Sequence, residues 1–394
     1  MQARLQIGKN AAYSMPRILT IVIDSGGVGA LPDAGQYGDA PGANTIANVA
    51  AHVGGLNMPN LERLGLGNVT PIVGVAAARE PAAAVARLAE RSKGKDTITG
   101  HWEMAGIITE VAFPTYPAGF PAEVVAAFTA ITGRPPLGNK PASGTKIIEE
   151  LGAEHMRSGR PILYTSADSV FQVAAHESMV PLTTLYEWCQ SARAMLVAPH
   201  AVNRVIARPF EGQPGGFART VNRRDYAILP PVNVLDRLAA AAVPVHAVGK
   251  ICDIYCGRGI ASSVRVTDNR DAVNKTLQLL ESTEHGLIFV NLNDFDSKFG
   301  HRRNVRGYGE ALEALDASIP QVLERLRPRD EVLFTADHGC DPTAPGSDHT
   351  REFVPYIHLG GPQRGALGML QGLDVVGRAI ETALIDERER VQIA

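Results

Sequence analysis

The sequence predicts an α/β fold with a mostly parallel central sheet flanked by helices, and a second domain inserted into it. Two observations lead to this prediction. Toward both ends of the chain, short apolar segments alternate with helical segments, as expected of a buried parallel sheet. The middle of the chain lies between two proline-containing segments, which are typical of connections.

Four segments are predicted to be strands of the central sheet. They are RILTIVID (17–24), VPVHAVG (243–249), HGLIFVNLND (285–294) and DEVLFTAD (330–337). All but 243–249 end on an aspartate, at the edge where parallel sheets bind ligands. A turn or a helix cap explains any one such aspartate equally well, but three together favour a site.

Helices are predicted between these strands. One covers DAVNKTLQLLEST (271–283), and another covers YGEALEALDASIPQVLERLR (308–327). Because proline lacks the backbone N–H that a helix interior needs, we expect Pro320 to interrupt the second helix.

The domain boundaries follow from the segments FPTYPAGFP (113–121) and AILPPVNV (227–234). We predict a core of residues 17–111 and 230–394, with an inserted domain over 112–229. Residues 1–16 form an N-terminal extension that we expect to be disordered. This extension lacks the apolar centre of a secretion signal.

Composition excludes several classes of function. The 394 residues are 45% hydrophobic and 20% charged with a net charge of -3, so neither nucleic acid nor a membrane surface is an expected partner. No apolar run approaches the roughly 20 residues that span a bilayer. The four cysteines show no disulfide-rich spacing, which favours a cytoplasmic protein.

Carboxylates and imidazoles gather at the predicted strand ends, which indicates a metal site. The candidates are Asp24, Asp294, Asp296, His301, Asp337, His338, Asp348 and His349. Mixed oxygen and nitrogen ligands suit Mn, Zn or Fe(II) better than Ca or Mg. The set is large enough for two ions, the usual arrangement for moving a phosphoryl group.

A single Asp-His pair is more often a surface turn than a site. Here two such pairs lie eleven residues apart, and the sequence also has an Asp-x4-His motif and a strand-end aspartate. Together these features favour a site over a surface turn. Asp294 and Asp348 each precede a better candidate and could only hydrogen-bond to the ligands. Asp341 could cap a turn.

The segment GKDTITGHWE (94–103) has two interpretations. It could be a loop and helix start capped by Thr97 or Thr99. Alternatively, one threonine could be a hydroxyl nucleophile, which needs a metal or a base to be activated. Taken alone, the segment favours capping.

Six motifs occur in one order along the chain. They are DSGGVGALPDA, GKDTITGHWE, YTSADSVFQVAAHE, NRVIARPFEG, FDSKFGHRR and TADHGCDPTAPGSDHTRE. With them the chain resembles the phosphopentomutases, the prokaryotic metal-dependent branch of the alkaline phosphatase superfamily, over nearly everything after residue 16. The resemblance implies an alkaline-phosphatase-like core with an inserted α+β cap domain. One departure is Gly26, where such enzymes usually have a bulky apolar residue, and it predicts a looser turn.

The resemblance also implies roles for individual residues. Thr97 would carry phosphate as phosphothreonine and reach two manganese ions, for which zinc or cobalt could substitute. One ion would be held by Asp24, Asp337 and His338. The other would be held by Asp296, His301 and His349.

Residues that bind substrate are implied in the same way. Ser166 and Asp168 would contact the sugar hydroxyls, and Lys250 could also meet a phosphate. Arg204 and Arg219 would bind the non-reacting phosphate, which the planar guanidinium suits. In each case the arginine four residues further on, Arg208 or Arg223, could do so instead.

The reaction implied is the interconversion of α-D-ribose 1-phosphate and ribose 5-phosphate, and of the 2-deoxyribose pair, in nucleoside salvage. It would pass through a bisphosphate intermediate, with glucose 1,6-bisphosphate as primer. The partners would be small sugar phosphates, and a monomer is compatible with the sequence. Three alternatives stay open: a metal-dependent phosphomonoesterase, a cofactor-independent phosphoglycerate mutase, and a non-catalytic metal-stabilised binding module.

Overall fold

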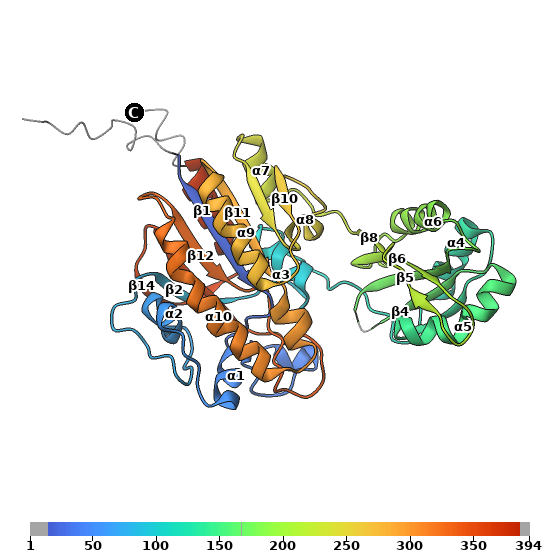
Figure 1. Ribbon diagram of the computed structural model, residues 1–394, viewed down its shortest axis with the longest axis horizontal. Helices are drawn as coiled ribbons and strands as arrows, with labels where there is room; N and C mark the ends of the chain where they lie inside the picture. The colour runs from blue at the N-terminus through green and yellow to red at the C-terminus, as the bar shows by residue number, and fades with distance from the viewer. Residues whose placement is uncertain (1–14, 167, 387–394) are drawn as a thin grey trace, which may run out of the picture. The chain divides into compact units, whose positions relative to one another are not determined.

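The computed structural model describes residues 15–166 and 168–386. The predicted extension over residues 1–16 therefore falls almost wholly outside the described residues. The chain forms two compact units, one made of the residues up to 111 with those from 230 onward, and one made of residues 112–229. Each unit has its own sheet and its own apolar core (Figure 1).

The first unit is built on an eight-stranded sheet with the order β10-β9-β11-β1-β12-β13-β2-β14. Only β13 runs antiparallel to its neighbours among these strands. The predicted, mostly parallel central sheet is therefore confirmed. In the order of the sheet the strands are β10 (Ser262–Val264), β9 (Val245–Val248), β11 (Gly286–Leu292), β1 (Arg17–Ile23), β12 (Glu331–Thr335), β13 (Val354–Leu359), β2 (Ala84–Ala89) and β14 (Gly365–Gln371).

Strand β1 occupies the middle of this sheet, and each of its seven residues is buried. It pairs in parallel with β11, where Arg17 lies opposite Gly286, and with β12, where Ile18 lies opposite Glu331. Because the three strands run in one direction, the residues that follow them meet at one edge of the sheet.

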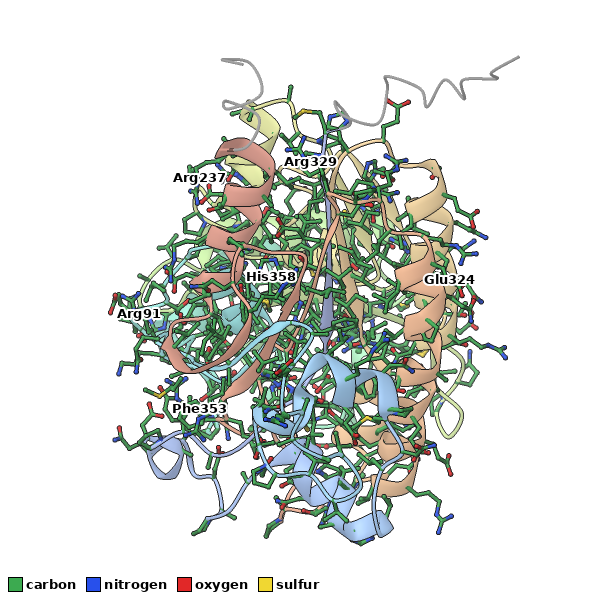
Figure 2. The ribbon with its side chains drawn as sticks, turned by 90° about the vertical axis from the view of Figure 1, so that its left-hand side faces the viewer. Arg91, Arg237, Glu324, Arg329, Phe353 and His358 are labelled. Carbon is green, nitrogen blue, oxygen red and sulfur yellow. The ribbon has the colours of Figure 1, made fainter. Side chains whose placement is uncertain are left out.

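Helices cover both faces of the sheet, as the side view shows (Figure 2). On one face α10 packs against α1, α2 and α9, and on the other α11 packs against α3 and α7. These helices are α1 (Thr45–Val53), α2 (Pro59–Leu64), α3 (Thr97–Met104), α7 (Val234–Ala240), α9 (Asn269–Ser282), α10 (Val305–Glu324) and α11 (Asp374–Glu381), and the short helix α8 (Ile251–Ile254) follows β9.

The expected interruption at Pro320 is wrong. Helix α10 runs through this proline to Glu324, with Ile319 and Val322 buried on either side of it. Burying this face in the core outweighs the single backbone hydrogen bond that proline cannot form.

The inserted unit is an α+β domain with the strand order β3-β4-β5-β6-β7, and β8 pairs with β6. Helices α4 and α6 cover one sheet face around Phe128 and Phe171, and α5 covers the other around Ile147 and Tyr164. The elements are α4 (Ala122–Thr132), β3 (Leu137–Pro141), α5 (Gly144–Ser158), β4 (Ile162–Thr165), β5 (Val170–His176), α6 (Leu182–Met195), β6 (Arg204–Glu211), β7 (Ala218–Arg219) and β8 (Arg224–Ala227).

Candidate metal centre and active site

The three central strands deliver acidic side chains to one edge of the sheet. Asp24 follows β1 directly, and Asp337 follows β12 after one residue. Asp296 follows β11 on a π-helical turn, Phe295–Gly300, a local widening of the helix that is frequent at functional sites. All three carboxylates are buried, and buried charges need partners or a metal.

One group of potential ligands consists of Asp24, Asp337 and His338, whose ligand atoms all lie within 4.8 Å of one another. His338 Nε2 lies 3.2 Å from Asp337 Oδ2 and 3.7 Å from Asp24 Oδ1. This spacing lets the three side chains approach one common ion.

A second group adjoins the first. Asp296 Oδ1 lies 3.1 Å from His349 Nε2 and 3.4 Å from His301 Nε2. The ring centroids of His338 and His349 are 4.0 Å apart, and those of His301 and His349 are 4.5 Å apart. The structure therefore brings all six predicted ligands into one continuous cluster, while their division between two ions stays a prediction.

The sequence analysis missed one neighbour of this cluster, Cys340. Its sulfur forms a further group of potential ligands with Asp296 and His301, and it lies 3.9 Å from His301 Nδ1. Its place two residues after His338 is the only sequence signal that could have drawn attention to it.

Thr97 points its hydroxyl at this cluster from the first turn of α3. Its Oγ1 lies 3.1 Å from His338 Nε2. The helix cap is Asp96, whose carboxylate accepts from the N–H groups of Ile98 and Thr99 at 3.1 and 3.2 Å. The interpretation of Thr97 or Thr99 as the cap is therefore wrong. Asp96 caps the helix, which leaves the Thr97 hydroxyl available.

The turn after Asp24 is anchored rather than loose. Ser25 has a φ of 74°, a strained value for a residue with a side chain. Its N–H donates to Asp337 Oδ1 at 3.0 Å, and the Tyr308 hydroxyl donates to its carbonyl at 3.1 Å. At Gly26 a Cβ would stand 2.9 Å from Ile23 Cγ2, so glycine fits closely here.

The buried carboxylates of the cluster favour a positive charge beside them. Burial raises the pKa of Asp24 to about 7, and the Asp337 carboxylate adds to this shift. Burial lowers the pKa of His338, but Asp337 outweighs this effect and brings the pKa to about 10. Burial also opposes ionisation of Asp296, yet His349 holds the pKa of that carboxyl below its usual value. Protonated imidazole thus supplies charge that a cation could supply instead.

A further observation indicates that these residues are suited to bind divalent metal ions. Asp24 Oδ1 is buried and accepts no hydrogen bond from the part of the chain that the structure describes. An orphaned carboxylate oxygen is costly unless a cation binds it. The donors are carboxylate oxygens and imidazole nitrogens, which suit manganese, zinc or cobalt.

The chain is similar to known proteins over nearly its whole length. A model of the metalloenzyme superfamily matches residues 16–380. The phosphopentomutase of Clostridium novyi is 54% identical, over 87% of this chain and 88% of that one. That of Carboxydothermus hydrogenoformans is 53% identical, over 88% and 89%, and that of Anaeromyxobacter sp. strain K is 54% identical, over 89% and 90%.

The chain belongs to the phosphopentomutase family. It is therefore a mutase, in the class of isomerases, and a member of the metalloenzyme superfamily. The resemblance drawn from the six sequence motifs is confirmed. Within the described residues, no helix has the length and apolar character needed to cross a membrane.

Three other acidic residues of the first unit have partners of their own. Asp294 accepts from the Asn269 N–H at 3.0 Å and pairs with Lys298. Asp348 lies 3.0 Å from Lys95 Nζ. Asp341 accepts from the Thr343 N–H at 2.9 Å and caps the turn.

Four of the predicted substrate-binding residues lie in the inserted unit. Ser166 and Asp168 stand in the loop between β4 and β5. Arg204 begins β6 beside this loop, since its N–H donates to the Ser169 carbonyl at 3.3 Å. Arg219 ends β7 and pairs with Phe210 near the far end of β6, away from Arg204 at the start of that strand.

Arg219 belongs to a cluster of arginines. Its Nη2 and the Tyr164 hydroxyl both pack against Gly144. Burial lowers the pKa of Arg208, and the positive charges of Arg223 and Arg219 add to this shift. These three arginines therefore place positive charge near Tyr164, which Asp225 offsets in part, and the excess favours an anion.

Lys250 lies in the first unit, after β9. Its Nζ is 3.8 Å from Asp24 Oδ2. The structure therefore places this predicted substrate-binding residue beside a candidate metal ligand.

Proposed function

We propose that this phosphopentomutase interconverts α-D-ribose 1-phosphate and ribose 5-phosphate, and the corresponding 2-deoxyribose phosphates, in nucleoside salvage in the cytoplasm. One observation carries the proposal: the Thr97 hydroxyl lies 3.1 Å from His338, which can share an ion with Asp24 and Asp337 and also lies within ligand distance of Asp296 and His349. A hydroxyl in that position is suited to accept and donate a phosphoryl group.

Thr97 is the residue that carries the phosphoryl group. The bond between phosphorus and Thr97 Oγ1 breaks as a new bond forms to the free hydroxyl of a bound sugar monophosphate. The hydroxyl proton passes to Thr97 Oγ1, and a bisphosphate results. The other phosphoryl group of the bisphosphate then passes to Thr97 Oγ1, and the isomeric monophosphate is left. The N-terminus of α3, where Thr97 is the first residue, stabilises the added negative charge.

Asp24, Asp337 and His338 would hold one manganese ion, and Asp296, His301 and His349 the other. When bound, the two ions polarise the phosphoryl group and stabilise the attacking and leaving oxygens. Zinc or cobalt are acceptable substitutes for these ligands. Glucose 1,6-bisphosphate recharges Thr97 after accidental hydrolysis.

The remaining residues bind and orient the sugar phosphate. Ser166 and Asp168 contact its hydroxyl groups. Arg204 and Arg219 bind the non-reacting phosphate, supported by the positive charge of Arg208 and Arg219 near Tyr164. Lys250, close to Asp24, neutralises a phosphate near the metal ligands.

Phosphorus NMR tests the proposal against the phosphatase alternative. Ribose 5-phosphate is mixed with the enzyme, trace Mn²⁺ to limit line broadening, and catalytic glucose 1,6-bisphosphate. A new anomeric phosphate resonance with little inorganic phosphate is expected. Growth of inorganic phosphate alone would overturn the proposal, because water and not a sugar hydroxyl would then be the acceptor.

Mass spectrometry tests the proposed carrier residue separately. Enzyme treated with glucose 1,6-bisphosphate should contain one phosphoryl group on the peptide that includes Thr97. Phosphate on another residue would show a mutase with a different nucleophile.

A further inference from the structure

Two buried residues of the first unit contact the candidate site without belonging to any of the groups of potential ligands. His101 is the fifth residue of α3, four residues after Thr97, and it is fully buried. Its Nδ1 lies 2.9 Å from the Thr97 carbonyl oxygen and 3.1 Å from Asp337 Oδ2. One imidazole nitrogen therefore faces both the helix turn that carries Thr97 and a candidate metal ligand.

Asn291, also fully buried, is the second of these residues. It lies on β11, the strand next to β1. Its side-chain Nδ2 donates to Asp24 Oδ2 at 3.0 Å, and it lies 3.4 Å from His101 Nε2. Asn291 and His101 thus form a bridge between Asp24 and Asp337, the two carboxylates of the first ligand group.

The donor and acceptor capacities of these side chains determine where the protons of the bridge lie. A carboxylate only accepts hydrogen bonds, so Asn291 must turn its amide nitrogen and not its oxygen toward Asp24. The second hydrogen of that amide faces His101 Nε2, which must be the acceptor. The imidazole proton is then on Nδ1, where it donates to the Thr97 carbonyl oxygen, with Asp337 Oδ2 close to the same nitrogen.

The surroundings hold the imidazole in this position. The Tyr255 hydroxyl donates to the His101 carbonyl, and the Phe289 ring lies 6.3 Å from the imidazole, centroid to centroid. A fully buried ring in a packed interior keeps one rotamer. The Nδ1 donor is therefore preorganised.

We propose that His101 and Asn291 are positioning residues that orient Asp24 and Asp337 for metal binding and tie the Thr97 turn to the same centre. This inference rests on the proposed function. Asn291 engages Asp24 Oδ2 and leaves Asp24 Oδ1, the orphaned oxygen, free for a cation. His101 sets the distance between Asp337 and the Thr97 backbone, so metal affinity and phosphoryl transfer depend on one imidazole.

Two substitutions of His101 distinguish a role in positioning the site from a role in packing the interior. The amide nitrogen of asparagine can take the place of histidine Nδ1, whereas glutamine reaches the Nε2 position instead. His101→Asn should therefore retain an N–H that donates to the Thr97 carbonyl and lies beside Asp337, and His101→Gln should lose it. Both remove the ring, so both carry a similar packing loss.

The readouts are the Mn²⁺ dissociation constant, from the EPR signal of free Mn²⁺ on metal-stripped enzyme, and kcat and KM for ribose 5-phosphate. Outer hydrogen-bond partners of metal ligands typically contribute about 10- to 100-fold to affinity, and we expect a loss of this size for His101→Gln. We expect kcat to fall with little change in KM. His101→Asn should recover most of both losses.

Asn291→Leu provides an independent variant should His101→Gln fail to fold. It removes the donor to Asp24 at similar side-chain volume, and we expect weaker Mn²⁺ binding again. A matched control is His155→Gln in the inserted unit. His155 is also fully buried, and its Nε2 accepts from the His176 N–H at 2.8 Å. The control should lower the melting temperature and leave Mn²⁺ affinity unchanged.

The outcomes distinguish this inference from the proposed function. If wild-type enzyme binds Mn²⁺ and all variants bind it equally well, His101 and Asn291 only fill space and the inference is overturned alone. If wild-type enzyme binds no Mn²⁺, the metal centre of the proposed function fails and the inference fails with it. Rescue by His101→Asn supports positioning, since a purely structural role would not favour asparagine over glutamine.

Discussion

Gly100 of helix α3 packs directly against the backbone of Asp337: a Cβ at position 100 would stand 2.1 Å from the Asp337 carbonyl oxygen. The helix that carries Thr97 and the chain segment that carries Asp337 therefore meet at a distance that only glycine allows. This close approach places the proposed nucleophile and a proposed metal ligand in one rigid contact.

Gly100→Ala should push these two segments apart. Overpacking of a tight contact costs about 1–3 kcal/mol, so the urea midpoint should fall, and kcat should fall because Thr97 moves relative to Asp337. Gly35→Ala is the matched control, since no atom lies within 4 Å of a Cβ there. Equal stability and activity of the two variants would contradict the contact.

Thr97→Ala should abolish mutase turnover while the enzyme retains its metal, because the proposed metal-binding carboxylates and imidazoles are unchanged. Turnover is measured with ribose 5-phosphate, and metal content by elemental analysis. Thr97→Ser keeps a hydroxyl and should retain part of the activity. Loss of metal from the alanine variant would instead show that Thr97 serves chiefly as a ligand.

Asp337→Ala should empty at least one metal site, since it removes a carboxylate that lies 3.2 Å from His338. Elemental analysis after gel filtration measures the loss. Asp294→Asn is the control near the end of a neighbouring strand, because Asp294 bonds to Asn269 and Lys298. Full occupancy in Asp337→Ala would refute the ligand assignment.

Arg219→Ala should raise KM for ribose 5-phosphate more than it lowers kcat. A hydrogen bond to a charged group contributes about 1.5–3 kcal/mol, which corresponds to about 10- to 100-fold in KM. Arg223→Ala is the control, because Asp225 already neutralises Arg223 through two hydrogen bonds at 2.6 and 2.5 Å. A larger effect in Arg223→Ala would reverse the assignment between these two arginines.

The central sheet could be predicted because its evidence is local. β1, β11 and β12 are largely apolar segments buried along their length, and apolar segments of this kind are visible in the sequence. The acidic and imidazole side chains were visible for the same reason, since Asp-His pairs beside strand ends carry recognisable chemistry.

His101, Asn291 and Cys340 could not be found in this way. His101 looks like any buried helix residue until α3 is placed against Asp337, and Asn291 looks like one polar residue in an apolar strand. Their contacts join segments far apart in the chain, which no short pattern records. Pro320 shows the opposite failure, because tertiary packing overrode a correct local preference.

The place of β1 in the sheet has a consequence for synthesis on the ribosome. β1 is made first, yet both strands that flank it, β11 and β12, are made after the whole inserted unit. Domains generally fold as units while the chain grows, so the inserted unit is complete while β1 still has two open edges. An apolar strand with open edges invites aggregation. A nascent chain of this protein therefore needs protection until its last third emerges.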